Sequence, residues 1–455
     1  MNIRRIITQR LGVDKAIFFT LLGRGLQIST ALFTVLFITR YLSPEEQGYY
    51  YTFGSIVGIQ VFFELGLTQI ITQFVAHEAS YLKWDKDYNI IGEDKYKSRL
   101  ASLLRFCAKW YSIFAVLIII ALLVAGVLFF NKYNESSEGI SWKLPWVLLV
   151  VGTAFNFLLA PVIAFIEGLG KVKEMAQIRL VQQIIHPIVI WGGLAIGSKL
   201  FVSGADAVLR ILVVAIIIYK APFFKILKGI WNTNIKEFIS YKNEIFPVQW
   251  RIAISWISGY FIFQLFNPVL FASDGAHVAG QMGMSMHALN AVQALTLAWI
   301  NTKVPKLSGF IAQKQYNELD SLFSQTMKQM LIIGSSVLIA FVLIIGLIQY
   351  YDISPLGLNI GARFLPFIPL CLMAWSVFTM FPVNCWATYL RCHKKEPLML
   401  NSVVMGILCC ASTLILGGCY GLYGMCIGYA ILRVISLVWI HSVYRIKRKE
   451  WHENN

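Results

Sequence analysis

The chain has 455 residues, of which 57% are hydrophobic and 14% are charged, and its mean hydropathy is +0.65. This composition excludes an ordinary water-soluble domain and favours helices that lie in a lipid bilayer. The formal net charge of +16 would suit nucleic acid, but the cations lie in loops beside apolar stretches. We therefore expect anionic membrane lipids, and no nucleic acid, among the partners.

Twelve apolar stretches follow one another along the chain. A helix needs roughly 20 apolar residues to cross a hydrocarbon core of about 30 Å. The predicted crossings are 16–39, 48–75, 103–130, 144–167, 175–197, 200–219, 246–272, 277–301, 325–349, 363–390, 398–416 and 422–444. The sequence thus predicts an all-α polytopic membrane protein with about 12 transmembrane helices.

Lys and Arg are distributed unequally between alternate loops. If the amino terminus is cytosolic, 30 of the 39 lie on the cytoplasmic side, 5 on the outer side and 4 inside helices. Because loops rich in Lys and Arg stay in the cytosol, this asymmetry predicts that both termini are cytoplasmic.

A faint repeat relates the first and seventh crossings. Each copy has an arginine early in one helix, a turn that ends in glycine, and a glutamine twelve or thirteen residues later. The residues are Arg24, Gly48 and Gln60 in the first copy, and Arg251, Gly280 and Gln293 in the second. Six crossings separate the copies, so both have one orientation, as in the parallel repeats of many secondary transporters. Chance similarity of two apolar hairpins is the alternative.

The repeat predicts two six-helix bundles related by a parallel pseudo-two-fold axis. The first bundle spans 1–219, and the second spans 246–455 and ends in a basic cytoplasmic tail. The connector at 220–245 mixes apolar and basic residues, which suits a helix lying along the cytoplasmic membrane surface.

Ionisable residues inside the hydrocarbon are costly, by about 2.5–3.5 kcal/mol each on insertion scales, and usually face a bundle interior or a hydrated cavity. Here they are mostly cations: Arg24, Arg210, Arg251 and Arg433, with Glu64. A guanidinium offers planar donors for phosphate or carboxylate oxygens, so a cationic interior predicts an anionic ligand. Asp206 lies four residues before Arg210, and these two can instead neutralise each other.

Polar side chains recur at helical spacing on the eighth crossing, at His287, Asn290, Gln293 and Thr296. Such a stripe faces either a water-filled path or a neighbouring helix. We predict a substrate cavity lined by the four arginines, Gln60, Asn290 and Gln293.

Glu64 has two open interpretations. It can form an ion pair with Arg24 on the adjacent helix, or it can bind and release a coupling ion, H⁺ or Na⁺, during transport. No Cys-x-x-Cys and no His-x-x-x-His spacing occurs, so we expect no metal site and no other cofactor.

The stretch RYLSPEEQGYY at 40–50, followed by FELGL at 63–67, resembles the opening hairpin of the polysaccharide transporter family. This family includes flippases of O-antigen and other lipid-linked oligosaccharides. It belongs to the superfamily of multidrug, oligosaccharidyl-lipid and polysaccharide exporters. The twelve-crossing plan with paired six-helix halves extends the resemblance to nearly the whole chain.

The resemblance implies a flippase, not an enzyme. It would move an undecaprenyl-pyrophosphate-linked glycan, such as the O-antigen unit of lipopolysaccharide, to the outer leaflet of the bacterial inner membrane. Alternating access would expose a cationic central cavity to each side in turn, and other glycan-assembly proteins are further candidate partners. A lipid II flippase would carry two further carboxy-terminal crossings and is not favoured.

Two alternatives stay open. A multidrug exporter of the same superfamily usually carries cationic drugs, which suit carboxylates and aromatic surfaces better than arginines. A membrane glycosyltransferase or polymerase would place catalytic carboxylates or a sizeable loop at the outer face, where the predicted loops are short.

Overall fold

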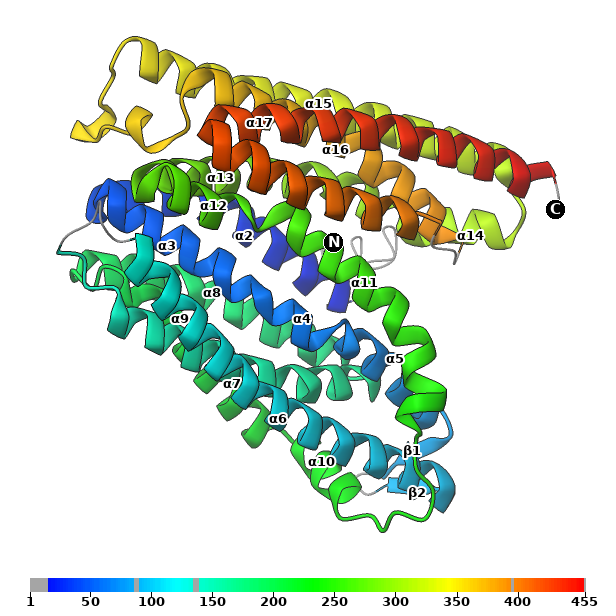
Figure 1. The fold of residues 1–455 in the computed structure, drawn as a ribbon. Coiled ribbons are helices and arrows are strands. Elements are labelled where there is room, and N and C mark those ends of the chain that lie inside the picture. Colours follow the sequence, from blue (N-terminus) through cyan, green and yellow to red (C-terminus); the bar gives the residue numbers. More distant parts are fainter. Residues whose placement is uncertain (1–14, 86–89, 134–138, 394–396, 454–455) are drawn as a thin grey trace, which may run out of the picture. The chain divides into compact units, whose positions relative to one another are not determined.

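The computed structural model describes residues 15–85, 90–133, 139–393 and 397–453 and is helical almost throughout (Figure 1). The longer helices are α2 (Lys15–Tyr41), α3 (Pro44–Val57), α5 (Leu67–Ala79), α6 (Asp94–Tyr133), α7 (Lys143–Gly168), α8 (Val172–Ala195), α9 (Phe201–Lys220), α11 (Phe246–Phe263), α13 (Gly275–Asn301), α15 (Tyr316–Tyr350), α16 (Phe367–Cys392) and α17 (Met399–Glu453). The short elements are η1 (Gly58–Gln60), α4 (Val61–Glu64), α10 (Phe223–Trp231), η2 (Tyr241–Ile245), α12 (Phe266–Ser273), α14 (Val304–Ala312), η3 (Pro355–Gly357) and η4 (Gly361–Arg363).

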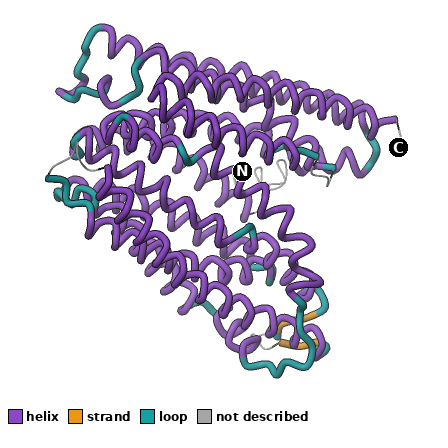
Figure 2. The backbone as a smooth tube through the Cα atoms, viewed as in Figure 1, coloured by secondary structure: helices purple, strands orange, loops and turns teal. Residues whose placement is uncertain are grey.

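One small hairpin departs from the predicted all-helical architecture. Strands β1 (Leu82–Trp84) and β2 (Ile90–Gly92) pair antiparallel, with Leu82 opposite Gly92. Figure 2 shows these strands as the orange segments in an otherwise helical chain. They lie in the loop between the second and third predicted crossings.

The chain is a multi-pass membrane protein. Eight helical segments of the described residues are long and apolar enough to cross a bilayer, or nine if Pro44–Glu64 and Leu67–Ala79 form one bent span. The last two predicted crossings both lie in α17, which is kinked at Gly421, where φ is 57° and ψ is −144°. The count of twelve crossings stays a prediction.

The second predicted crossing is not the continuous helix that 48–75 was expected to form. Its two halves are bent by 43°. At the break, Leu65 and Gly66 have left-handed backbones, with φ of 50° and 68°. A Cβ on Gly66 would also lie 2.4 Å from Cγ2 of Ile252. Glycine at this position therefore permits both the bend and the close packing.

The described chain forms two compact units. The first contains residues up to Gln27, Val57–Lys132 and Gly139–Trp256, and the second contains Ile28–Ile56 and residues from Ile257 onward. These units differ from the sequence-based halves because the hairpin 28–56 packs with carboxy-terminal helices. The boundaries 1–219, 220–245 and 246–455 stay a prediction about the repeat.

Small residues allow close helix packing in the first unit, where α9 packs against α7 and α8. A Cβ on Gly204 would lie 2.8 Å from the backbone nitrogen of Leu149, and one on Gly152 would lie 2.7 Å from Cβ of Ala207. In lipid, where apolar burial gives little driving force between helices, such contacts contribute much of the association energy.

In the second unit, a capping box begins α3. The Ser43 backbone N–H donates to the Glu46 carboxylate at 2.9 Å, and the Glu46 N–H donates to Ser43 Oγ at 3.1 Å. This reciprocal pair satisfies two backbone donors at the helix start. Residues 43–46, the segment SPEE of the stretch at 40–50, thus have a local structural role.

Gln47 and Arg363 join this hairpin to distant residues of the same unit. The Gln47 amide donates to the carbonyls of Gly280 at 2.8 Å and of Arg363 at 3.1 Å. The Arg363 guanidinium donates to the carbonyls of Leu42 at 2.6 Å and Thr39 at 3.2 Å, at the carboxy-terminal end of α2. A cation there also suits the helix dipole.

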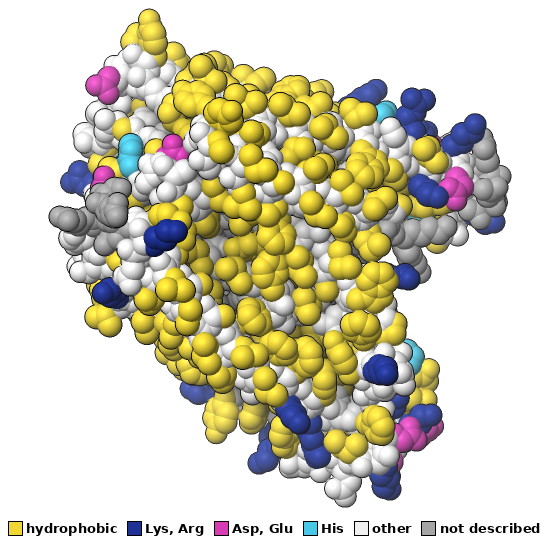
Figure 3. All heavy atoms as spheres, in the orientation of Figure 1, with side chains coloured by type: hydrophobic (Ala, Val, Ile, Leu, Met, Phe, Trp, Pro, Cys, Tyr) yellow, Lys and Arg dark blue, Asp and Glu magenta, His cyan; other side chains and the backbone are white. Residues whose placement is uncertain are grey.

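Apolar side chains cover the helices, and Lys and Arg gather near helix ends (Figure 3). Helices α6 and α15 each expose a row of large apolar residues. The exposed residues include Ile113, Val116, Leu117, Ile120, Val124 and Leu128 on α6, and Ile332, Ile339, Leu343, Ile344 and Leu347 on α15. Surfaces of this kind match lipid rather than water.

Candidate functional site

A pocket of about 520 Å³ lies within the second unit. Residues of α3, α12, α13 and α16, the end of α11 and the segment between α11 and α12 form its walls. The lining residues are Tyr51, Gly54, Ser55, Phe263, Gln264, Phe266, Asn267, Gly283, Met286, His287, Asn290, Gln293 and Met380. Its volume is in the range of small-molecule sites, and its lining carries no Asp, Glu, Lys or Arg.

Asn267 links two walls of the pocket. Its amide donates to Ser55 Oγ at 3.1 Å, which connects α12 to α3. Its Oδ1 is buried and accepts no hydrogen bond within the described part of the protein. A buried acceptor without a partner costs about 1–3 kcal/mol, so a ligand hydroxyl or a water would stabilise this site.

Three residues of the predicted polar stripe line the pocket: His287, Asn290 and Gln293. The fourth, Thr296, is buried, and its hydroxyl donates to the Val292 carbonyl at 2.8 Å. The spacing of polar residues along α13 therefore predicted one wall of this pocket. The opposite wall, with Tyr51, Ser55 and Asn267, was missed. Tyr51 and Ser55 share one face of α3, but Asn267 comes from α12, and no local pattern links the two helices.

Arg210, Arg251 and Arg433 do not line this pocket, and the side chain of the fourth predicted arginine, Arg24, lies outside the described residues. Arg433 on α17 is only 4% exposed, and its guanidinium lies 5.9 Å from the Tyr429 ring centroid. Arg251 on α11 is exposed and lies 5.4 Å from the Trp250 ring centroid. Neither guanidinium has a carboxylate within 4.0 Å among the described residues.

Arg210 has a carboxylate partner, as the i, i+4 spacing allowed. Its guanidinium lies 2.6 Å from Asp206 Oδ2 on the same helix, α9. His186 Nδ1, on α8, lies 3.0 Å from the same oxygen. Asp206 is only 4% exposed, so the two basic groups compensate a buried carboxylate. This arrangement favours a structural role for Arg210 over substrate binding.

Glu64 is the last residue of α4, directly before the bend. It accepts a hydrogen bond of 2.6 Å from the Thr68 hydroxyl across the bend. Gln60 lies in η1, one turn earlier, and is partly exposed. The side chain of Arg24 lies outside the described residues, so the proposed Arg24–Glu64 pair stays a prediction.

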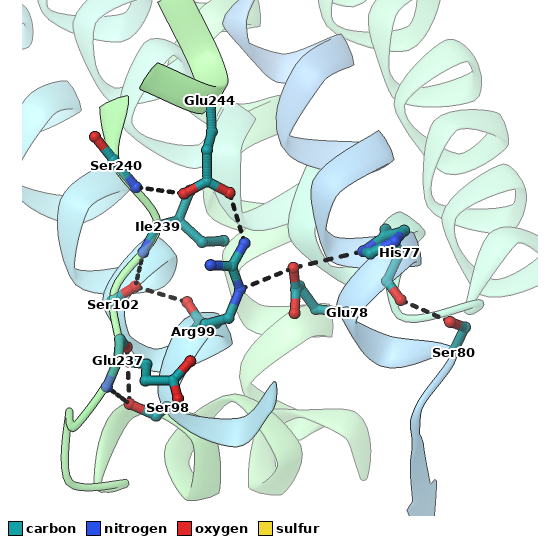
Figure 4. Close-up of polar contacts among 10 residues, drawn as sticks. All are labelled: His77, Glu78, Ser80, Ser98, Arg99, Ser102, Glu237, Ile239, Ser240 and Glu244. Atoms are coloured by element: carbon teal, nitrogen blue, oxygen red, sulfur yellow. Dashed lines mark hydrogen bonds and ion pairs between the residues drawn. The ribbon is translucent and has the colours of Figure 1, made fainter. Parts of the chain in front are cut away.

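An ionic cluster fixes the segment that leads into α11, the helix that carries Arg251 (Figure 4). Arg99 on α6 donates to Glu78 at 3.0 Å and to Glu244 at 2.6 Å. Glu78 is only 2% exposed. Ser98 Oγ accepts from the backbone N–H groups of Lys236 and Glu237, both at 2.7 Å. The end of the predicted connector is therefore attached to α6.

The connector begins with α10, which has the amphipathic character that the sequence predicted. Phe223, Ile226 and Ile230 are buried against the first unit, whereas Lys225 and Lys228 are exposed. A basic outer face of this kind suits anionic lipid headgroups.

Known structures share this fold, although no family model matches the chain and no match is found among curated proteins. One is an inward-facing multidrug resistance MATE family transporter of the MOP superfamily, with a TM-score of 0.66 and 13% identity over 97% of this chain and 99% of that one. A second is the lipid II flippase MurJ in an inward closed conformation, with a TM-score of 0.60 and 12% identity over 95% of this chain and 88% of that one. A third is the MATE multidrug transporter DinF-BH, with a TM-score of 0.60 and 14% identity over 95% of this chain and 94% of that one.

The chain therefore has the fold of MOP-superfamily transporters over nearly its full length. At these identities the likeness concerns the fold alone. The proteins with this fold include multidrug transporters and a lipid II flippase.

Proposed function

We propose that this protein is a flippase for a polyprenyl-pyrophosphate-linked oligosaccharide, such as an O-antigen or similar surface glycan unit. In this proposal it belongs to the polysaccharide transporter family and works in the bacterial inner membrane. Alternating access between two six-helix halves would carry the headgroup from the cytoplasmic to the outer leaflet.

The observation that carries this proposal is that neither Arg251 nor Arg433 has a carboxylate within 4.0 Å among the described residues. The buried carboxylate Asp206 is already paired with Arg210, whereas Arg251 and Arg433 each lie beside an aromatic ring. A cationic drug would gain nothing from such groups. A pyrophosphate would receive charge-assisted hydrogen bonds from either guanidinium.

Transport in proteoliposomes tests the proposal directly. The probes are undecaprenyl pyrophosphate linked to an oligosaccharide and, for the multidrug alternative, the cationic dye ethidium. We expect movement of the glycolipid and none of the dye. Movement of the dye alone would replace the flippase with a multidrug exporter, which the MATE-like fold makes the second candidate.

The role of the arginines has its own variants. Arg251→Ala should reduce glycolipid transport by about 10-fold or more, because charged hydrogen bonds are worth about 1.5–3 kcal/mol. Arg251→Lys should recover only part of it, since a lysine lacks the planar fork. Arg40→Ala, at an exposed cation of α2, is the matched control. Unchanged transport in both Arg251 variants would contradict the electrostatic role.

Topology and ion coupling complete the proposal. We propose twelve crossings with both termini in the cytosol, which labelling of single cysteines introduced into the loops from either side of the membrane would test. Glu64 is the proposed H⁺ or Na⁺ coupling site. Glu64→Gln should then change the pH or sodium dependence of transport, and identical dependences would remove Glu64 from this role.

A further inference from the structure

We infer that the pocket between α3, α12 and α13 binds an uncharged sugar residue of the transported molecule. This inference rests on the proposed function and assigns the saccharide, rather than the pyrophosphate, to the second unit. Four side-chain amides line the pocket, and they belong to Gln264, Asn267, Asn290 and Gln293.

Three of these amides are available to a ligand. The side chains of Gln264, Asn290 and Gln293 make no hydrogen bond to other described residues, although they line the same pocket. Each amide offers two donors and one acceptor. A sugar hydroxyl is also both donor and acceptor, so paired contacts with amides satisfy both groups.

Asn267 adds a fixed acceptor. Its amide nitrogen is held by Ser55 at 3.1 Å, which orients the side chain and leaves Oδ1 buried without a donor. A hydroxyl group placed there would satisfy it. The pocket also contains the rings of Phe263 and Phe266, whose flat apolar surfaces suit the C–H face of a pyranose ring.

Other ligand classes fit these walls poorly. The described lining offers a pyrophosphate no Lys or Arg, only His287, and it offers a cationic drug no carboxylate. A polyprenyl tail would leave the amides without hydrogen bonds. A neutral, polyhydroxylated ligand remains, and the volume of about 520 Å³ suits a ligand of that size.

The test measures binding of full-length protein in nanodiscs to a matched set of probes. One probe is undecaprenyl pyrophosphate alone, and the others carry a single glucose, galactose or N-acetylglucosamine. We expect at least one sugar to tighten binding about fivefold or more. Gln293→Leu and Asn290→Ala should remove this gain while binding of the sugar-free probe stays unchanged.

Controls separate failure of this inference from failure of the proposed function. Asn317→Leu, on α15 outside the pocket, should bind every probe like the wild type. If no sugar tightens binding, or if the pocket variants weaken all probes equally, the sugar assignment is overturned although the flippase proposal stands. If the wild type binds none of the probes, the proposed function itself fails.

Discussion

Gly48 on α3 and Gly280 on α13 face each other in direct contact. A Cβ on Gly280 would lie 2.9 Å from the backbone nitrogen of Gly48, and one on Gly48 would lie 1.9 Å from the Ala276 carbonyl oxygen. These are the two glycines that the sequence repeat places at equivalent positions. The two-fold repeat itself stays a prediction.

Adding one methyl group at this contact should weaken the fold. Gly48→Ala would force Cβ against a backbone carbonyl, which cannot rotate away, and overpacking of this kind costs about 1–3 kcal/mol. We expect a lower midpoint of thermal unfolding, followed by tryptophan fluorescence in detergent.

Gly54→Ala is the matched control on the same helix, since no atom lies within 4 Å of its added Cβ. Alanine favours helix there by up to about 1 kcal/mol, so its midpoint should be equal or higher. Equal destabilisation by both variants would show that the contact does not matter.

Arg363 should stabilise the second unit in a nearly pH-independent way. Arg363→Met removes donors from the Leu42 and Thr39 carbonyls and should lower the free energy of unfolding by about 1.5–3 kcal/mol. Burial lowers the pKa of this guanidinium, and the nearby Glu45 and Glu46 carboxylates raise it.

Arginine nevertheless stays protonated around neutral pH in both the folded and the unfolded chain. Folding then takes up no proton at this group, so the loss should be the same at about pH 6 and about pH 9. The measurement is thermal or denaturant unfolding at both pH values. Arg40→Met, at an exposed arginine of the same hairpin, should have little effect; a comparable loss there would point to bulk charge instead of the Arg363 contacts.

Sequence periodicity predicted the features that depend on residues three or four positions apart on one helix. The stripe with Asn290 and Gln293 and the pair Asp206–Arg210 both follow from 3.6 residues per turn. The Ser55–Asn267 contact joins residues 212 positions apart, and nothing local in either segment signals the other. The bend at Leu65 was missed because leucine rarely adopts a positive φ, so only the following glycine marked it.

Arg99 should be the most sensitive residue of the ionic cluster in Figure 4. Arg99→Met leaves the buried Glu78 carboxylate with only the exposed His77, at 3.5 Å, beside it, and should cost about 3–5 kcal/mol. Glu244→Gln should cost less than about 1 kcal/mol, because its side chain is 32% exposed and its charge is screened by solvent. Chemical denaturation of the purified variants gives both values.

Lys97→Met, which removes a longer and more exposed ion pair on the same helix, serves as the control for Arg99. It should leave stability unchanged within error. We predict that the loss of stability decreases from the Arg99 variant to the Glu244 variant to the Lys97 variant. If the Glu244 variant is as unstable as the Arg99 variant, burial of Glu78 does not explain the effect of Arg99.

Asp206 and Arg210 allow a structural ion pair to be distinguished from a substrate site. Arg210→Met alone leaves the buried carboxylate with only His186 and should destabilise the protein by about 3–5 kcal/mol. Asp206→Leu alone leaves a guanidinium whose side chain is 37% exposed, so it should cost less. The double variant replaces both charges with apolar side chains of similar length, and such replacements are often neutral or stabilising. We therefore expect the double variant to recover stability to within about 1 kcal/mol of the wild type and to keep glycolipid transport in proteoliposomes. If the double variant is stable but no longer transports, Arg210 contacts the substrate, because loss of the ion pair alone would then not explain the loss of transport.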